Sequence, residues 1–174
     1  KSILEYETVD YDMENHALVI IDQTKLPNDI VLLSLTAAQD IWDAIYLLKV
    51  RGAPAIGVAA AFGLAALAHR ILTQDRDAFL EELIEKKEFL NSARPTAVNL
   101  SWALGRMMDV CHKNPEASAE VLKRLLLEEA FLMKQEDISV CKKIGEYGLG
   151  VLKEGDGILT HCNAGQLATC KYGT

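Results

Sequence analysis

The sequence predicts an α+β fold: a small N-terminal β element and a helical bundle, followed by the first strand of a truncated Rossmann-like α/β domain with a parallel sheet. Three short β-prone runs lie within the first 35 residues. Helical patterns with apolar stripes follow them to about residue 152. A glycine-rich turn then precedes one further β-prone run, which a loop of small residues ends.

The N-terminal β element consists of three predicted strands. They span residues 5–11, 17–22 and 30–35, and the second contains the apolar run Val-Ile-Ile. The sequence Leu-Pro-Asn-Asp at 26–29 favours a loop, because proline and the Asn-Asp pair stabilise turns. We expect this element to pack on helices.

The first predicted helix begins at a candidate capping box. Thr36 is the expected N-cap and Gln39 has the spacing to reach back to it. Gly52 is a plausible end of this helix, because glycine adopts the left-handed conformation easily. Its apolar stripe consists of Ala38, Ile41, Ile45 and Leu48.

The second predicted helix is apolar on every face. Residues 53–68 are all apolar, glycine or proline, and Pro54 suits the first helical turn. A membrane span is the alternative, but sixteen residues is short for one. The many alanines and glycines allow neighbouring helices to approach closely, so we predict a buried central helix.

Three further helices are predicted from caps and prolines. Asp75 or Asp77 caps the third, whose charged residues form a solvated face, and Pro95 precedes the fourth. The sequence Asn-Pro-Glu at 114–116 is expected to open the fifth, which runs to about residue 152. The sequence does not decide whether that helix is broken near residues 134–137.

The end of the sequence favours a second domain. A strand at 158–161 and a helix start at 166–168 have the geometry of a parallel α/β unit. One strand cannot build a sheet alone. We therefore expect residues 1–153 to form an N-terminal domain and residues 154–174 to begin an α/β domain that continues outside this sequence.

Composition excludes some classes of partner. The net charge of −7 argues against nucleic acid or an anionic membrane surface as the main partner. No signal peptide is recognisable at the start. The four cysteines show no CxxC pair and no zinc-type spacing. Cysteines placed within predicted helices suggest reduced thiols and an intracellular setting.

Cys162 is a candidate reactive thiol. It follows the predicted strand and faces a predicted helix start, where the helix dipole would favour the thiolate. A buried structural cysteine is the alternative. A metal site with His161 and Cys170 carries little weight, because adjacent residues of a strand point to opposite faces.

Two arginines stand just before proline-marked helix starts. Arg51 precedes Gly-Ala-Pro, and Arg94 precedes Pro-Thr. A helix N-terminus offers free amides and a positive dipole end, and arginine adds a forked cationic donor set. The alternative is that both arginines close surface turns. Two such sites in one domain favour anion binding, although no nucleotide-binding fingerprint is present.

Three motifs resemble the methylthioribose-1-phosphate isomerase family. They are RGAPAIG at 51–57, ARPTAVNLSWA at 93–103 and THCNAG at 160–165, and the similarity runs from about residue 19 to residue 174. This family is related to regulatory subunits of the translation-initiation guanine-nucleotide exchange factor and to ribose-1,5-bisphosphate isomerases. Gln166 departs from the small residue expected at its position.

The resemblance implies conversion of 5-methylthioribose 1-phosphate to 5-methylthioribulose 1-phosphate in methionine salvage. It implies that Arg51, Gly52, Ala53 and Arg94 bind the sugar phosphate and that Cys162 is the catalytic thiol. It also implies a cytoplasmic homodimer, no metal or organic cofactor, and a catalytic aspartate beyond this segment. A non-catalytic regulatory or sugar-phosphate-sensing homologue is the alternative, as is an isomerase of another ribose or deoxyribose phosphate.

Overall fold

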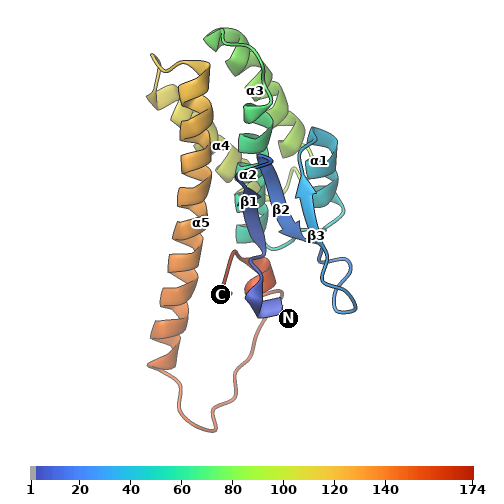
Figure 1. Cartoon of the computed structure of the whole chain (residues 1–174). Coiled ribbons are helices and arrows are strands. Elements are labelled where there is room, and N and C mark those ends of the chain that lie inside the picture. Colours follow the sequence, from blue (N-terminus) through green and yellow to red (C-terminus); the bar gives the residue numbers. More distant parts are fainter. Residues whose placement is uncertain (1–2) are drawn as a thin grey trace.

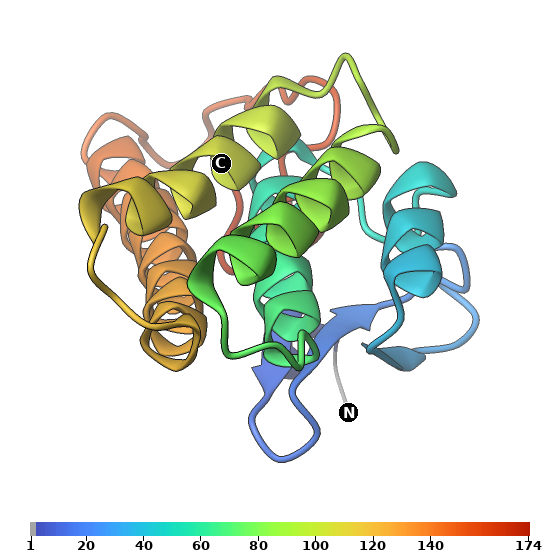
Figure 2. The same cartoon turned by 90° about the horizontal axis from the view of Figure 1, so that it is seen from above.

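The computed structural model describes residues 3–174. It contains a three-stranded antiparallel sheet, five α-helices and two short 3-10 helices. The helices surround one central helix, and the sheet covers its remaining side (Figures 1 and 2). No helix in the described part of the chain is long and apolar enough to cross a membrane.

The sheet confirms the predicted N-terminal β element. Its strand order is β1-β2-β3, and both pairs are antiparallel. Val9 pairs with Ile20, and Leu18 with Leu35. The first strand begins later than predicted, because the 3-10 helix η1 (Ile3–Glu5) precedes it. The strands are β1 (Val9–Asp12), β2 (Ala17–Ile21) and β3 (Leu32–Leu35).

Helix α2 (Ala53–His69) is the buried central helix that the sequence predicts. Every residue from Ala55 to Ala68 is buried. Two glycines set the distance to neighbouring helices. A Cβ atom at Gly57 would lie 3.1 Å from the carbonyl oxygen of Asn99, and one at Gly63 would lie 2.8 Å from Cγ2 of Ile41. Small side chains therefore permit this close packing.

The start and end of the first helix differ from the prediction. Helix α1 (Ala38–Tyr46) has Ala37 as its N-cap, and no side chain caps it. The predicted capping box does not form, because Gln39 donates instead to Asp43 Oδ1 at 2.8 Å. Gly52 does not end this helix; it is the N-cap of α2, with φ of 101°.

The remaining helices follow the predicted order. Asp75 caps α3 (Arg76–Asn91) by accepting a hydrogen bond from the amide of Ala78. Helix α4 (Val98–Lys113) starts three residues after Pro95, so this proline lies in the preceding turn rather than in the helix. Asp75 is thus the cap that the local sequence predicts correctly.

Helix α5 (Ala119–Leu149) is a single long helix of 31 residues. Its N-cap is Ser118, so the Asn-Pro-Glu sequence at 114–116 lies in the loop before it. Nothing breaks the helix at 134–137, although Lys134 is buried there. Its ammonium pairs with Glu7 and with Asp10 at 2.6 Å, so the charges of β1 and its preceding segment compensate the buried cation.

The strand predicted at 158–161 is absent. These residues form an exposed connection after α5, and the side chain of Leu159 is 97% exposed. No other strand of the described residues lies beside this segment to supply ladder hydrogen bonds. The chain then returns to the foot of the sheet and forms the 3-10 helix η2 (Gln166–Ala168), close to η1 (Figure 1). The predicted helix start is therefore one short turn.

Candidate active site

The sequence-predicted binding residues Gly52, Ala53 and Arg94 line one cavity. It has a volume of about 330 Å³ and lies between the N-terminus of α2 and the segment that leads into α4. The two arginine-proline motifs are more than forty residues apart in the sequence, and the fold brings them together. The full set of lining residues is Gly52, Ala53, Ile56, Arg94, Thr96, Ala97, Val98 and Asn99.

This cavity offers the groups that an anion needs. The first turn of α2 presents backbone amides and the positive end of the helix dipole. Arg94 is a partly buried lining residue and supplies a guanidinium with a permanent positive charge. Arg51 is exposed and is not among the lining residues, although it directly precedes Gly52. The arrangement suits a phosphate group.

Cys162 lies outside the residues that line this cavity. It is exposed, in the connection between α5 and η2, and its φ of 58° places it in the left-handed region. The predicted strand and helix start do not frame it in this structure. A thiol in this position is open to reagents and substrates, which argues against the alternative of a buried structural cysteine.

The other three cysteines are buried and unsuited to nucleophilic chemistry. Burial raises the pKa of the Cys111 thiol to about 11. Burial and the nearby Asp137 carboxylate also raise the pKa of Cys141 and of Cys170. Because the thiolate is the reactive form, burial and the raised pKa values disfavour reaction of these three thiols at neutral pH. Cys162 is therefore the accessible thiol of the described chain.

The segment after Cys162 is fastened to the N-terminal part of the chain. Gln166 Nε2 donates to the carbonyl oxygen of Tyr6 at 2.8 Å, and Thr8 Oγ1 donates to the carbonyl oxygen of Gln166 at 3.1 Å. Gln23 Nε2 donates to the carbonyl oxygen of Leu167 at 2.8 Å. These contacts span about 140 to 160 residues of sequence, so no local pattern predicts them.

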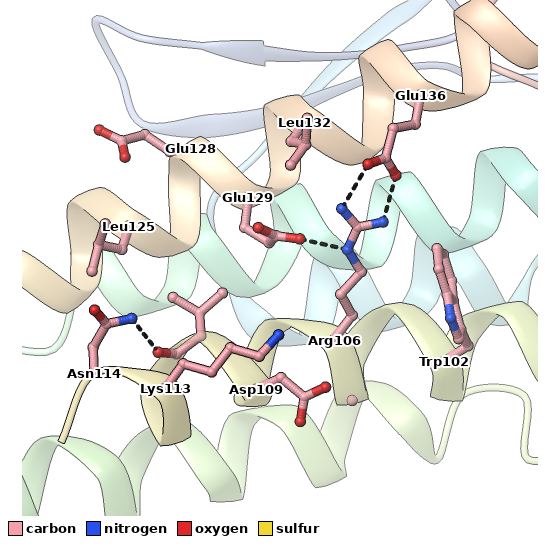
Figure 3. A pocket seen from close by; sticks show the side chains of 12 residues that line it. Trp102, Arg106, Asp109, Lys113, Asn114, Leu125, Glu128, Glu129, Leu132 and Glu136 are labelled. Carbon is pink, nitrogen blue, oxygen red and sulfur yellow. Dashed lines mark hydrogen bonds and ion pairs between the residues drawn. The ribbon is translucent and has the colours of Figure 1, made fainter.

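A larger cavity, of about 1030 Å³, lies between α4 and α5 (Figure 3). Arg106 extends from α4 toward α5, where it pairs with Glu129 and Glu136, and its guanidinium lies 5.6 Å from the ring centre of Trp102. The hydrogen bonds to Glu136 help to raise the pKa of Arg106. Glu129 and Glu136 are seven residues apart, so helical periodicity places them on one face. The seven-residue spacing of Glu129 and Glu136 is a sequence signal for this cluster that the predictions above do not include.

No metal centre is visible in the described residues 3–174. They contain no group of three or more His, Cys, Asp or Glu side chains that could hold an ion.

Comparison with known proteins identifies the family. The profile of the Initiation factor 2 subunit family matches residues 49–170, which include both arginine motifs and Cys162. The chain belongs to this family. Two similar solved structures are described as proteins of different function. One is 5-methylthioribose 1-phosphate isomerase from Pyrococcus horikoshii, with a TM-score of 0.90 and 40% identity, covering 97% of this chain and 46% of that one.

The second solved structure is the delta subunit of translation initiation factor eIF-2B from A. fulgidus. It has a TM-score of 0.85 and 40% identity, with coverage of 96% of this chain and 48% of that one. The fold alone therefore occurs in proteins with and without the isomerase name.

Curated relatives of this family member include isomerases of two sugar phosphates. Methylthioribose-1-phosphate isomerase from Parabacteroides distasonis is 50% identical over 94% of this chain and 49% of the relative. The 5-deoxyribose 1-phosphate isomerase from Bacillus cereus is 46% identical over 98% of this chain and 49% of the relative. The chain thus spans about half the length of these relatives.

Proposed function

We propose that the polypeptide containing this chain is an aldose-ketose isomerase of 5-methylthioribose 1-phosphate, with 5-methylthioribulose 1-phosphate as product. The observation that carries the proposal is the shared cavity of Gly52, Ala53 and Arg94, in a chain 50% identical to a protein of that name. The cavity supplies an anion site, and the Cys162 motif supplies an accessible thiol beside the anchored segment.

In this proposal the phosphate binds at the N-terminus of α2. Gly52 and Ala53 let the backbone approach the phosphate oxygens, and Arg94 pairs with them across the cavity. Arg51 is exposed and directly precedes Gly52, and in this proposal it adds a second guanidinium to the bound phosphate. Two guanidinium groups offset the acidic net charge of −7 at this point of the surface.

The proposed chemistry begins with opening of the furanose ring. The phosphate on C1 prevents simple ring opening, so an acid protonates the ring oxygen as its bond to C1 breaks. Hydrogen then moves from C2 to C1, through a base and an enediol or as a hydride, and C2 becomes the ketone carbon. Cys162 acts in this transfer as proton carrier or as stabiliser of the transition state.

The rest of the catalytic set is proposed to lie beyond residue 174. We place an acidic aspartate in a Rossmann-like second domain that residues 154–174 begin, after an N-terminal domain of residues 1–153. The length of the curated relatives, about twice that of this chain, supports a second part of this kind. A homodimer in the cytoplasm completes the proposal, and the free, mostly buried cysteines suit a reducing compartment.

The substrate test compares two sugar phosphates. The relatives named 5-deoxyribose 1-phosphate isomerase favour that compound as the second candidate substrate. The full-length polypeptide is assayed with each compound, and ketose formation is followed by NMR. We expect kcat/KM to be higher for 5-methylthioribose 1-phosphate. Higher kcat/KM for the deoxyribose compound would reassign the substrate. No turnover of either compound would favour a non-catalytic role, which the similarity to the eIF-2B delta subunit makes the second candidate function.

A further inference from the structure

Gln166 is four residues after Cys162 and is tied to the opposite end of the described chain. Its side-chain amide donates to the carbonyl oxygen of Tyr6 at 2.8 Å, and its own carbonyl accepts from the hydroxyl of Thr8 at 3.1 Å. Thr8 is fully buried, so water competes little for this second hydrogen bond. Gln166 therefore holds this segment through both its side chain and its backbone carbonyl.

The same segment contacts Gly52, one of the residues that line the anion cavity. Ala168, the last residue of η2, approaches the N-cap of α2 so closely that a Cβ atom at Gly52 would meet its Cα at 2.3 Å. Gly52 in turn lines the cavity together with Arg94. Fastening η2 therefore ties the segment that follows Cys162 to Gly52 at the N-terminus of α2.

Chain length limits how far Cys162 can move from this anchor. Four residues span at most about 14 Å when fully extended. Cys162 itself is exposed, and the residues from Gly150 to Asn163 are exposed too, so little else in the described chain holds the thiol in place. Ala164 accepts a hydrogen bond from the amide of Thr174 at 2.8 Å within the same segment, and the first attachment to the N-terminal part of the chain is the one that Gln166 makes.

We propose that Gln166 is a positioning residue, whose hydrogen bond to Tyr6 holds the Cys162 thiol near Arg51 and Arg94. A small residue at this position would keep the backbone acceptor for Thr8 and lose the donor to Tyr6. The side-chain amide reaches the Tyr6 carbonyl oxygen in the N-terminal segment, so it acts through the loop. The role in turnover rests on the proposed function, whereas the placement of the thiol is tested independently.

The placement is measured with two thiol reagents of opposite charge on the full-length protein. An anionic and a cationic methanethiosulfonate compete for the accessible Cys162, and mass spectrometry assigns the modified peptide. Each rate is normalised to that of a small free thiol. Near two arginines at low salt, the anionic reagent should react roughly threefold faster or more. Inorganic phosphate should reduce this preference by occupying the arginines.

The variants Gln166→Ala and Gln166→Asn remove or shorten the donor, and Gln135→Ala on the exposed face of α5 is the matched control. We expect the charge preference to fall toward unity in both Gln166 variants and to persist in the control. The milder Asn variant covers the case in which the Ala variant folds poorly. An unchanged preference in folded Gln166 variants, or no preference in the wild type, would overturn the proposed placement.

Turnover gives the second readout. If Gln166 positions the thiol, kcat should fall about tenfold in Gln166→Ala while KM changes little, because the phosphate contacts remain. A lost charge preference with normal kcat would overturn the positioning role and leave only a structural anchor. A wild type without turnover would contradict the proposed function, and the reagent preference would still decide where the thiol lies.

Discussion

Gly52 and Ala168 are in direct backbone contact across 116 positions of sequence: a Cβ atom at Gly52 would lie 2.3 Å from the Cα of Ala168. Gly52 also has φ of 101°, which a residue with a side chain adopts only with strain. The pair joins the N-terminus of the central helix to the segment that follows Cys162.

The first prediction is that Gly52→Ala destabilises the fold. The strained φ and the clash with Ala168 should together lower the free energy of unfolding by about 2 kcal/mol or more. Urea unfolding followed by circular dichroism measures the change. Gly105→Ala on α4 is the control, because nothing lies within 4 Å of the new Cβ atom. Alanine there should stabilise by about 0.5–1 kcal/mol, and equal effects at the two positions would contradict this account.

The second prediction concerns the two arginines. Arg51→Ala and Arg94→Ala should each weaken phosphate binding by about 1.5–3 kcal/mol if each makes charge-assisted hydrogen bonds. Lysine should restore only part of the affinity, because it lacks the planar fork. Isothermal titration with inorganic phosphate provides the measurement. The control is Arg124→Ala, whose exposed side chain pairs with Glu128 on α5; a similar loss there would show a nonspecific charge effect.

The third prediction tests the buried cation of α5. Burial alone would lower the pKa of Lys134, but hydrogen bonds from its ammonium to Asp10 and Glu7 outweigh it and raise the pKa. Lys134→Met keeps the stem and removes the charge. Glu7 and Asp10 are 37% and 47% exposed, so water can solvate them after the change. We expect a loss of about 2 kcal/mol in unfolding free energy.

Lys142→Met is the matched control for Lys134. Its ammonium lies 3.7 Å from Glu146 in an exposed pair on the same helix. Exposed pairs of this kind contribute about 0–1 kcal/mol. If Lys134→Met is as mild as Lys142→Met, the Lys134 cluster does not stabilise the junction of β1 and α5.

The fourth prediction is a pH dependence at the stacked histidines. The rings of His16 and His69 lie 3.5 Å apart. Burial and the positive charges of His16, Lys123 and Arg70 lower the pKa of His69, against a smaller opposing effect of Glu120. Because the pKa is lower in the folded state, the stability from His69 is present above its ordinary value near 6.5 and is lost as the pH falls.

Urea unfolding at pH 7.5 and pH 5 measures this effect. The wild type should lose more stability between the two values than His69→Gln does, because the variant carries no titrating ring there. His112→Gln, on the exposed face of α4, should behave like the wild type. The account of the stacked pair is wrong if His69→Gln shows the full wild-type pH dependence.

Features that depend on local chemistry were predictable from the sequence. The all-apolar composition of 53–68 correctly predicts a buried helix, and Asp75 correctly predicts a cap, because both depend on neighbours in sequence. The N-caps Ala37 and Ser118 differ from the predicted Thr36 and Asn114. Ser118 is also a local N-cap signal, and its side chain accepts from the amide of Val121. The strand at 158–161 fails because strands need partners that these residues lack here.

The candidate site was predictable only in part. The motifs indicated Arg51, Gly52, Ala53 and Arg94; the structure brings the last three to one cavity and leaves Arg51 outside the residues that line it. The placement of Cys162 in that cavity stays a prediction. The anchor made by Gln166 joins residues about 160 positions apart, and no periodicity or motif reports such a contact.

The most direct test of the proposed function is the turnover of Cys162→Ser in the full-length polypeptide. Serine replaces the thiol with a hydroxyl of similar size that lacks the acidity of the thiol. We expect kcat with 5-methylthioribose 1-phosphate to fall by about 10² or more while phosphate affinity changes little, because the arginines bind the phosphate. Near-normal turnover by the serine variant would remove Cys162 from the mechanism and contradict the proposal.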